Sequence, residues 1–203
     1  MAPLLQFTPL SSLWVRKGDI IFSHSETNLG RLIRWAEQAP GEPPSWTNHV
    51  GIVSKSGFLV PPGMEPTAMV VESLWKTIES DWGKTHASEI GLQAQVWRST
   101  TLTGDNMEKV IETAKAFVGR SYGWWKLFGH LADRLLFKGN RHISRFLQID
   151  SRPICSYTVA VSMEAGGVYF GDAPRVMDPD SELDWVESHP HEWVKVGDFE
   201  MRG

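Results

Sequence analysis

The chain has 203 residues, of which 41% are hydrophobic, with a formal net charge of -4 and one cysteine. These values predict a single domain spanning 1–203 with one core, exclude an internal disulfide, and argue against a nucleic-acid partner, because nucleic-acid-binding proteins usually carry a basic surface. No apolar run approaches the roughly 18 residues of a membrane-spanning helix, so any membrane contact is expected to be peripheral.

The amino-terminal segment gives no sign of a Sec signal peptide. It lacks a basic region ahead of a continuous apolar run, and Pro3 and Pro9 interrupt the hydrophobic residues that it has. A cytoplasmic enzyme, a virion protein and an effector exported by another route are all compatible with this segment.

Strand patterns dominate the first hundred residues. A strand is expected over 19–23, and a short helix over 29–38. Alternating side chains predict a strand that begins at His49, and β-branched and aromatic residues predict further strands over 68–75 and 94–100. Together these segments predict a small antiparallel sheet.

Helical spacing follows in the second half. Apolar residues predict a helix over 104–118, and residues 121–152 form a Trp-rich and basic insertion that could be core, a lid or an amphipathic surface on lipid. A further helix is expected with Ser151 as its N-cap, which places Cys155 in its first turn. From Val168 onward the chain is expected to be mostly ordered loop with one short strand.

The position of Cys155 favours nucleophilic chemistry. A thiol in the first turn of a helix feels the positive end of the helix dipole, which favours the thiolate and lowers the pKa. A lone cysteine is also often a buried, inert residue. Catalysis further requires a histidine within hydrogen-bond reach and a polar group that orients it. His49 and Glu72, on neighbouring predicted strands, can face one side of the sheet, where the cysteine-bearing helix could pack.

Six short motifs resemble those of a known family in the same order. They are GDIIF, NHVGIV, VVES, VWRS, GRSYG and ICS, and the ending DPDSELDWVESHPHEW also resembles the tail of that family. The family is the permuted NlpC-type cell-wall hydrolases, the YiiX/YebB-like group of papain-fold enzymes. In that group the histidine precedes the cysteine, as His49 precedes Cys155 here.

The resemblance implies an α+β, circularly permuted papain-like fold, with an antiparallel sheet packed against the cysteine-bearing helix. It implies Cys155 as nucleophile, His49 as general base and Glu72 as the orienting carboxylate. Tyr122 of GRSYG would lie on the substrate or oxyanion side, and Arg98 of VWRS would be a possible substrate contact, with a structural ion pair as the alternative.

Two departures from the family pattern affect the surroundings of the site. The family usually has an acidic residue after the GxxY tyrosine and a glutamate two places after the cysteine, where this chain has Gly123 and Tyr157. The long segment between Tyr122 and Cys155 also differs from the unpermuted cell-wall enzymes. The substrate class therefore stays open.

Other histidines offer weaker candidates. His24 follows the first strand and could line the cleft or simply be solvated. His189 and His191 form an HxH pair beside Glu192, but zinc needs three or four convergent ligands, so no metal site is expected.

The sequence thus predicts a cysteine peptidase or amidase that needs no cofactor and cleaves an amide bond through an acyl-enzyme. The resemblance implies an amide bond in a cell-wall peptide or a related small peptide as the substrate. A thioesterase or acyltransferase acting on lipid acyl groups is the enzymatic alternative, because the permuted fold includes lecithin:retinol acyltransferase-like members. A non-catalytic ligand-binding module is the alternative of another class.

Overall fold

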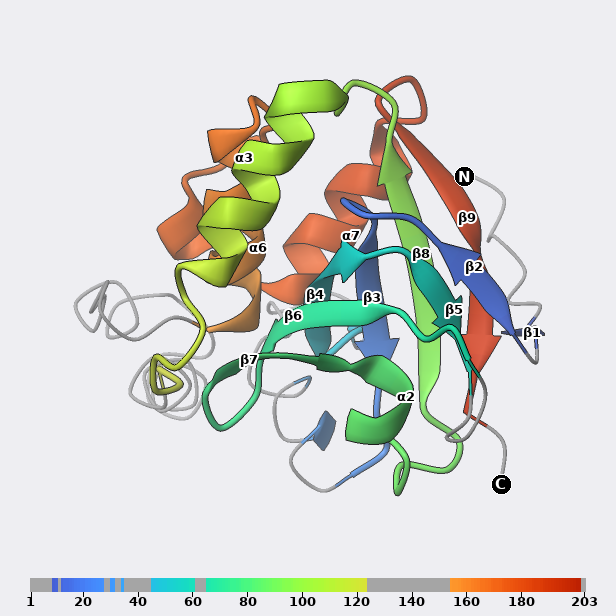
Figure 1. Ribbon diagram of the computed structural model, residues 1–203. Coiled ribbons are helices and arrows are strands. Elements are labelled where there is room, and N and C mark those ends of the chain that lie inside the picture. Colours follow the sequence, from blue (N-terminus) through green and yellow to red (C-terminus); the bar gives the residue numbers. More distant parts are fainter. Residues whose placement is uncertain are drawn as a thin grey trace.

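The computed structural model describes residues 9–10, 12–27, 30–31, 34, 45–60, 65–123 and 154–201 (Figure 1). The predicted helix over 29–38 falls largely outside these ranges. The part of the Trp-rich and basic insertion after Gly123 falls entirely outside them.

The described strands form one large sheet and one small ribbon. In the sheet, the order is β1-β9-β8-β3-β4-β6-β7, and every neighbouring pair is antiparallel except β1 and β9; β2 and β5 form the ribbon. The strands are β1 (Pro9–Leu10), β2 (Leu13–Val15), β3 (Ile20–His24), β4 (His49–Lys55), β5 (Gly57–Leu59), β6 (Met69–Ser73), β7 (Thr77–Asp81), β8 (Gln93–Ser99) and β9 (Trp193–Glu200).

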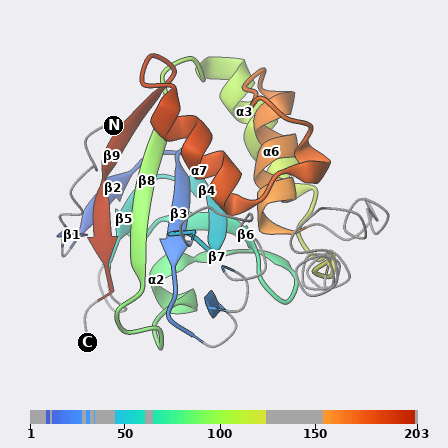
Figure 2. The ribbon, with the colours of Figure 1, turned by 180° about the vertical axis from the view of Figure 1, so that it is seen from behind.

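Three of the described helices, α3, α6 and α7, gather on one side of the sheet (Figures 1 and 2), whereas Trp82 of α2 belongs to the apolar cluster on the other side. The helical segments are α2 (Trp82–Thr85), α3 (Gly104–Lys115), α6 (Cys155–Ala165), the 3-10 turn η1 (Pro174–Val176) and α7 (Pro179–Ser188). Side chains of α3, α6 and α7 share one apolar cluster with the sheet residues Ile20, Phe22, Val50 and Ile52.

The opposite face of the sheet packs against the ribbon. Ile21, which lies between Ile20 and Phe22 in β3, belongs to a second apolar cluster with Val53 of β4 and with Leu59 of the ribbon. Successive side chains of a strand point to opposite faces, so a strand buried on both faces has no polar alternation. This explains the continuous apolar run in β3, which is buried throughout its length except at His24.

The predicted α+β arrangement, an antiparallel sheet packed against the cysteine-bearing helix, is confirmed. The expected strands correspond to β3, β4, β6, β8 and, for the short strand expected after Val168, β9, and the helix expected over 104–118 is α3. The sheet is larger than expected, because β7 and β1, which were not expected, form its two edges.

Two expectations about helices are wrong. Helix α6 begins at Cys155, not near Ser151, because Ile154 has an extended backbone (φ -99°, ψ 170°) and occupies the N-cap position. The segment expected to be loop contains α7, whose N-cap Asp178 accepts a hydrogen bond from the Ser181 backbone and is followed by Pro179 at the first helical position. Both are standard start signals of a helix.

The two N-caps offer a matched test of local stability. Asp178 Oδ1 accepts hydrogen bonds from the Ser181 backbone N–H and hydroxyl, both at 2.8 Å, whereas the N-cap of α3, Thr103, makes no side-chain capping bond. We expect Asp178→Ala to lower the free energy of unfolding by about 1 kcal/mol, and Thr103→Ala to lower it by less. Urea denaturation followed by circular dichroism measures both values, and equal losses would contradict this account of the α7 cap.

Candidate active site

His49 and Glu72 meet across two neighbouring strands. His49 is the first residue of β4, and Gly51, two residues on, pairs in register with Glu72 of β6. The two side chains therefore share a face of the sheet, and the His49 Nε2 atom lies 3.0 Å from Glu72 Oε2. A Cβ atom at Gly51 would lie 2.9 Å from Val70 Cγ1 and 3.3 Å from Glu72 Cβ, so glycine leaves the space that this close approach needs.

Cys155 reaches His49 from the other layer of the fold. Helix α6 packs on the face of the sheet that carries Val50 and Ile52, opposite to the face of Glu72. The expectation that the helix lies on the same face as Glu72 is therefore wrong. The thiol instead approaches the beginning of β4, where the His49 ring interacts with both Cys155 and Glu72.

Buried hydroxyl groups fix the first turn of α6. Thr158 Oγ1 lies 2.9 Å from Ser73 Oγ at the end of β6. Ser156 Oγ donates to the Met177 carbonyl at 2.9 Å. These bonds join the start of the helix to the sheet and to the segment before α7. They hold Cys155 in a fixed position relative to β4.

The environment of Cys155 favours the ion pair of thiolate and imidazolium. Burial raises the pKa of the Cys155 thiol, but the hydrogen bond and charge of His49, together with the backbone N–H groups of Val50 and Ser156, lower it below its ordinary value. Burial lowers the pKa of His49, but the hydrogen bonds and charges of Cys155 and Glu72 outweigh it and raise the pKa to about 10. Each partner thus stabilises the charged form of the other.

Glu72 is a buried carboxylate shared by two histidines. Its Oε2 atom lies 3.0 Å from His49 Nε2 and also 3.0 Å from His86 Nε2. Burial raises the pKa of Glu72, but the charge of His86 and the hydrogen bonds from both rings lower it to about 2. Glu72 is therefore ionised over the whole physiological range.

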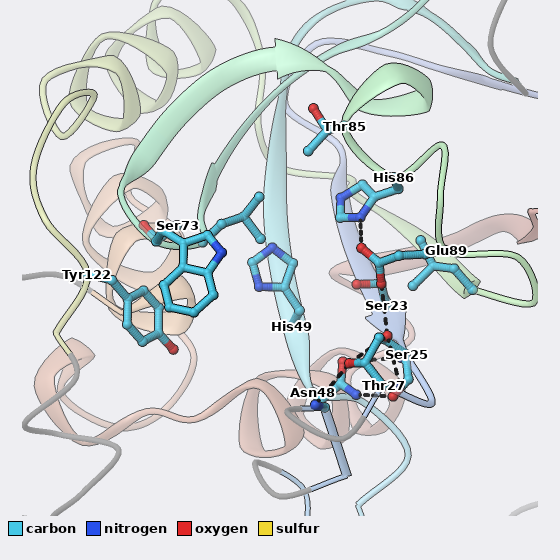
Figure 3. A pocket seen from close by; sticks show the side chains of 14 residues that line it. Ser23, Ser25, Thr27, Asn48, His49, Ser73, Thr85, His86, Glu89 and Tyr122 are labelled. Atoms are coloured by element: carbon cyan, nitrogen blue, oxygen red, sulfur yellow. Dashed lines mark hydrogen bonds and ion pairs between the residues drawn. The ribbon is translucent and has the colours of Figure 1, made fainter.

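A pocket of about 490 Å³ opens beside the His49 ring. Figure 3 shows His49 in the middle, Ser73 and Tyr122 on one side, and His86, Glu89, Ser25 and Asn48 on the other. The complete lining is Ser23, Ser25, Thr27, Gly30, Asn48, His49, Ser73, Leu74, Trp75, Thr85, His86, Glu89, Leu92 and Tyr122.

Of the three remaining predicted site residues, one lines the pocket and two lie outside its lining. Tyr122 lines the pocket, and its backbone N–H donates to the Trp75 carbonyl at 3.1 Å. His24 is absent from the lining and contacts Glu26 and the Trp46 carbonyl instead.

Arg98 is also absent from the pocket. Its Nε and Nη2 atoms donate to the two carboxylate oxygens of Asp19 at 2.7 and 2.8 Å, and Asp19 is buried. The guanidinium thus forms the structural ion pair that was the alternative to a substrate contact.

His86 and Glu89 are the site residues that sequence reasoning missed. His86 follows the short helix α2, and its Nδ1 atom lies 2.8 Å from Glu89 Oε1. No motif marks these residues, and their spacing of three is common by chance. Only the fold places His86 against Glu72.

The described residues contain no group of three or more His, Cys, Asp or Glu side chains arranged to hold a metal ion. The HxH pair is not assembled into such a group. His189 stacks on Trp185 with ring centroids 3.7 Å apart, and its Nδ1 atom lies 2.8 Å from the Trp185 carbonyl oxygen.

A comparison with known protein families shows which family this chain belongs to. Residues 14–128, more than half of the chain, match the family described as permuted papain-like amidase enzyme, YaeF/YiiX, C92 family. The chain belongs to this family. The predicted membership of the permuted papain-like group, its fold, and the prediction of a cysteine peptidase or amidase are thereby confirmed. The matched region includes His49 and Glu72 and ends before Cys155.

One solved structure is similar over much of its length. It is entitled the crystal structure of metalloprotein yiiX from Escherichia coli O157:H7, with 19% sequence identity, a TM-score of 0.48, and coverage of 77% of this chain and 69% of that chain. No curated protein matched this chain. None of the described helices is long and apolar enough to cross a membrane.

The buried charges predict how stability depends on pH. The pKa of Glu72 is about 2 in the folded chain, below its ordinary value of about 4.5, so its contribution is present above pH 4.5 and is lost as pH falls through 2. The raised pKa values of His49, about 10, and His86, about 9, give contributions that are present below about pH 6.5 and are lost as pH rises through those values.

We therefore expect Glu72→Gln to lower the free energy of unfolding by about 3 kcal/mol near pH 6, because it leaves two buried histidines without their carboxylate. It should also flatten the dependence on pH on both sides. Glu108→Gln, which removes an exposed partner of Lys17, is the control and should cost less than about 1 kcal/mol. Urea denaturation at a series of pH values measures this, and an unchanged profile in Glu72→Gln would contradict the electrostatic account.

Proposed function

We propose that this chain hydrolyses an amide bond with Cys155 as nucleophile, His49 as base and acid, and Glu72 as the carboxylate that orients His49. One observation carries the proposal: a single imidazole interacts with both a buried thiol and a buried carboxylate. This is the arrangement that nucleophilic thiol catalysis requires. The family's amidase activity supports the reaction class.

The two ring nitrogens of His49 have different roles. Nε2 donates to Glu72, which leaves Nδ1 to exchange a proton with the thiol. The carboxylate thus fixes the tautomer and stabilises the charged ring, as the third group of a catalytic triad does. The lowered pKa of Cys155 is consistent with a thiolate ready to attack.

The reaction follows from these roles. The Cys155 thiolate attacks the carbonyl carbon, and the developing oxyanion is stabilised by backbone N–H groups at the start of α6, where first-turn donors have no acceptor within the helix. The His49 imidazolium gives its proton to the leaving amine as the C–N bond breaks, which leaves a thioester on Cys155. His49 then takes a proton from water, which attacks the thioester and releases the acid.

The pocket supports a peptide as the substrate. Its lining combines apolar side chains, Leu74, Trp75 and Leu92, with hydroxyl and amide groups of Thr27 and Asn48, a mixture suited to a short peptide chain. Tyr122 would contact the substrate from the same wall as Trp75. We propose cell-wall peptides or related small peptides as the substrates.

Hydrolysis and trapping of an acyl-enzyme test this proposal together. We expect the wild type to release amines from short peptides or cell-wall peptide fragments, and Cys155→Ala and His49→Ala to lower kcat by roughly 10³-fold or more. Intact-protein mass spectrometry of quenched reactions should detect the peptide acyl group on Cys155. Ser162→Ala, a buried change on the same helix away from the thiol, is the control for folding.

Two outcomes would contradict the proposal. An acyl group that is transferred to Cys155 from phospholipid or a fatty-acyl thioester, with none from peptides, would replace the amidase by a lipid-directed thioesterase or acyltransferase. Turnover and acylation absent with both substrate classes would leave a ligand-binding module.

A further inference from the structure

His86 is the second histidine that contacts the Glu72 carboxylate. Its side chain is buried, and its ring packs against Trp82 of α2 with centroids 4.9 Å apart and the ring planes tilted by 45°. Its backbone N–H donates to the Trp82 carbonyl at 3.1 Å, which fixes the ring at the end of that short helix. The residue is therefore held in place independently of the pocket that it lines.

Both ring nitrogens of His86 face carboxylate oxygens. Nε2 lies 3.0 Å from Glu72 Oε2, and Nδ1 lies 2.8 Å from Glu89 Oε1. A carboxylate oxygen can only accept, and a neutral imidazole has one nitrogen without a proton. The two contacts together therefore require His86 in its doubly protonated, cationic form.

The electrostatic environment agrees with this geometry. Burial lowers the pKa of His86, but the charge of Glu72 and the hydrogen bonds with Glu72 and Glu89 outweigh it and raise the pKa to about 9. The charged groups that face His86 are Glu72 from β6, Glu89 from the segment before β8, and His49 from β4.

Glu72 depends on His86 for its orientation. Both imidazoles donate to the same oxygen, and within the described residues the other oxygen, Oε1, is buried and accepts no hydrogen bond. The His49 and His86 rings lie on either side of this carboxylate, with centroids 6.5 Å apart. A cation at His86 thus holds Glu72 in place and also opposes the positive charge on His49.

A hydrogen-bonded chain continues beyond His86. Glu89 Oε2 accepts from the Ser25 hydroxyl at 2.8 Å, and the Ser25 backbone is held by the amide side chain of Asn48, the residue before His49. These hydrogen bonds therefore lead back to the start of β4. Movement of His86 or Glu89 would displace His49 both through Glu72 and through Ser25 and Asn48.

We propose that His86 is a positioning residue for the Cys155–His49 pair, which holds Glu72 in place and balances part of its negative charge through a cationic imidazole. This inference rests on the proposed function. Glu89 accepts a hydrogen bond from the second nitrogen of His86, whose cationic form depends mainly on the charge of Glu72.

The test compares pH profiles of two variants that move in opposite directions. His86→Gln keeps a donor for Glu72 but removes the cation, so His49 and the thiol should hold their protons to higher pH, and both limbs of the profile should move up by roughly 0.5 to 1 pH unit. Glu89→Gln keeps an acceptor for Nδ1 of His86, which Glu72 holds in its cationic form, but removes a negative charge that also acts on His49, so the limbs should move down.

Each profile is measured as kcat/KM and, without any substrate, as the rate of iodoacetamide alkylation of Cys155. His191→Gln, an exposed histidine outside the described pocket lining, is the matched control and should leave both profiles unchanged. Circular dichroism establishes that the variants are folded; if His86→Gln does not fold, NMR titration of the His86 ring in the wild type, which should be cationic at neutral pH, still tests the proposal.

Coincident profiles for wild type and folded His86→Gln, or a neutral His86 ring at neutral pH in the wild type, would overturn the proposal. This failure is distinguishable from failure of the proposed function. If the wild-type thiol is unreactive and no amide is cleaved, the catalytic assignment is wrong. If the wild type is active and only the shifts are missing, His86 alone loses its role.

Discussion

The arrangement of the site depends on one buried oxygen atom. Glu72 Oε2 accepts hydrogen bonds from His49 and His86, and it lies in a part of the fold that excludes water. A buried carboxylate without cationic partners would take up a proton, and it would then no longer orient a neighbouring imidazole. The two histidines keep Glu72 charged, and Glu72 in turn keeps His49 in the orientation that faces the thiol.

The layers of the fold bring the charged groups to one point from both sides of the sheet. Glu72 and His86 lie with the ribbon-covered face, whereas Cys155 arrives on α6 from the helical face. The first residue of β4 is where a side chain can reach both, because beyond that point the sheet separates the two layers. The hydroxyl contact between Ser73 and Thr158 fixes the helix against the sheet, and a small shift of α6 would break the contact between thiol and imidazole.

Sequence reasoning succeeded where the signal was local and failed where it depended on register. Alternation and β-branched residues predicted the strands that carry His49 and Glu72. His86 escaped because its partner lies 14 residues away, and only the pairing of β6 with β7 brings α2 back over Glu72. The ion pair between Arg98 and Asp19 joins residues 79 apart, which no pattern within one segment can indicate. Helix α7 was predictable from Asp178 and Pro179, but the Asp- and Pro-rich composition favoured a loop.

The pH dependence of iodoacetamide alkylation at Cys155, measured for wild type, His49→Ala and Glu72→Gln with mass spectrometry to locate the adduct, tests the central claim most directly. The account predicts that the wild-type thiol reacts with an apparent pKa well below the free-thiol value of about 8.5. His49→Ala should abolish that shift, and Glu72→Gln should reduce it. A folded wild type whose Cys155 does not react, or reacts with the same profile in all three proteins, would contradict the claim that Cys155, His49 and Glu72 act as one unit.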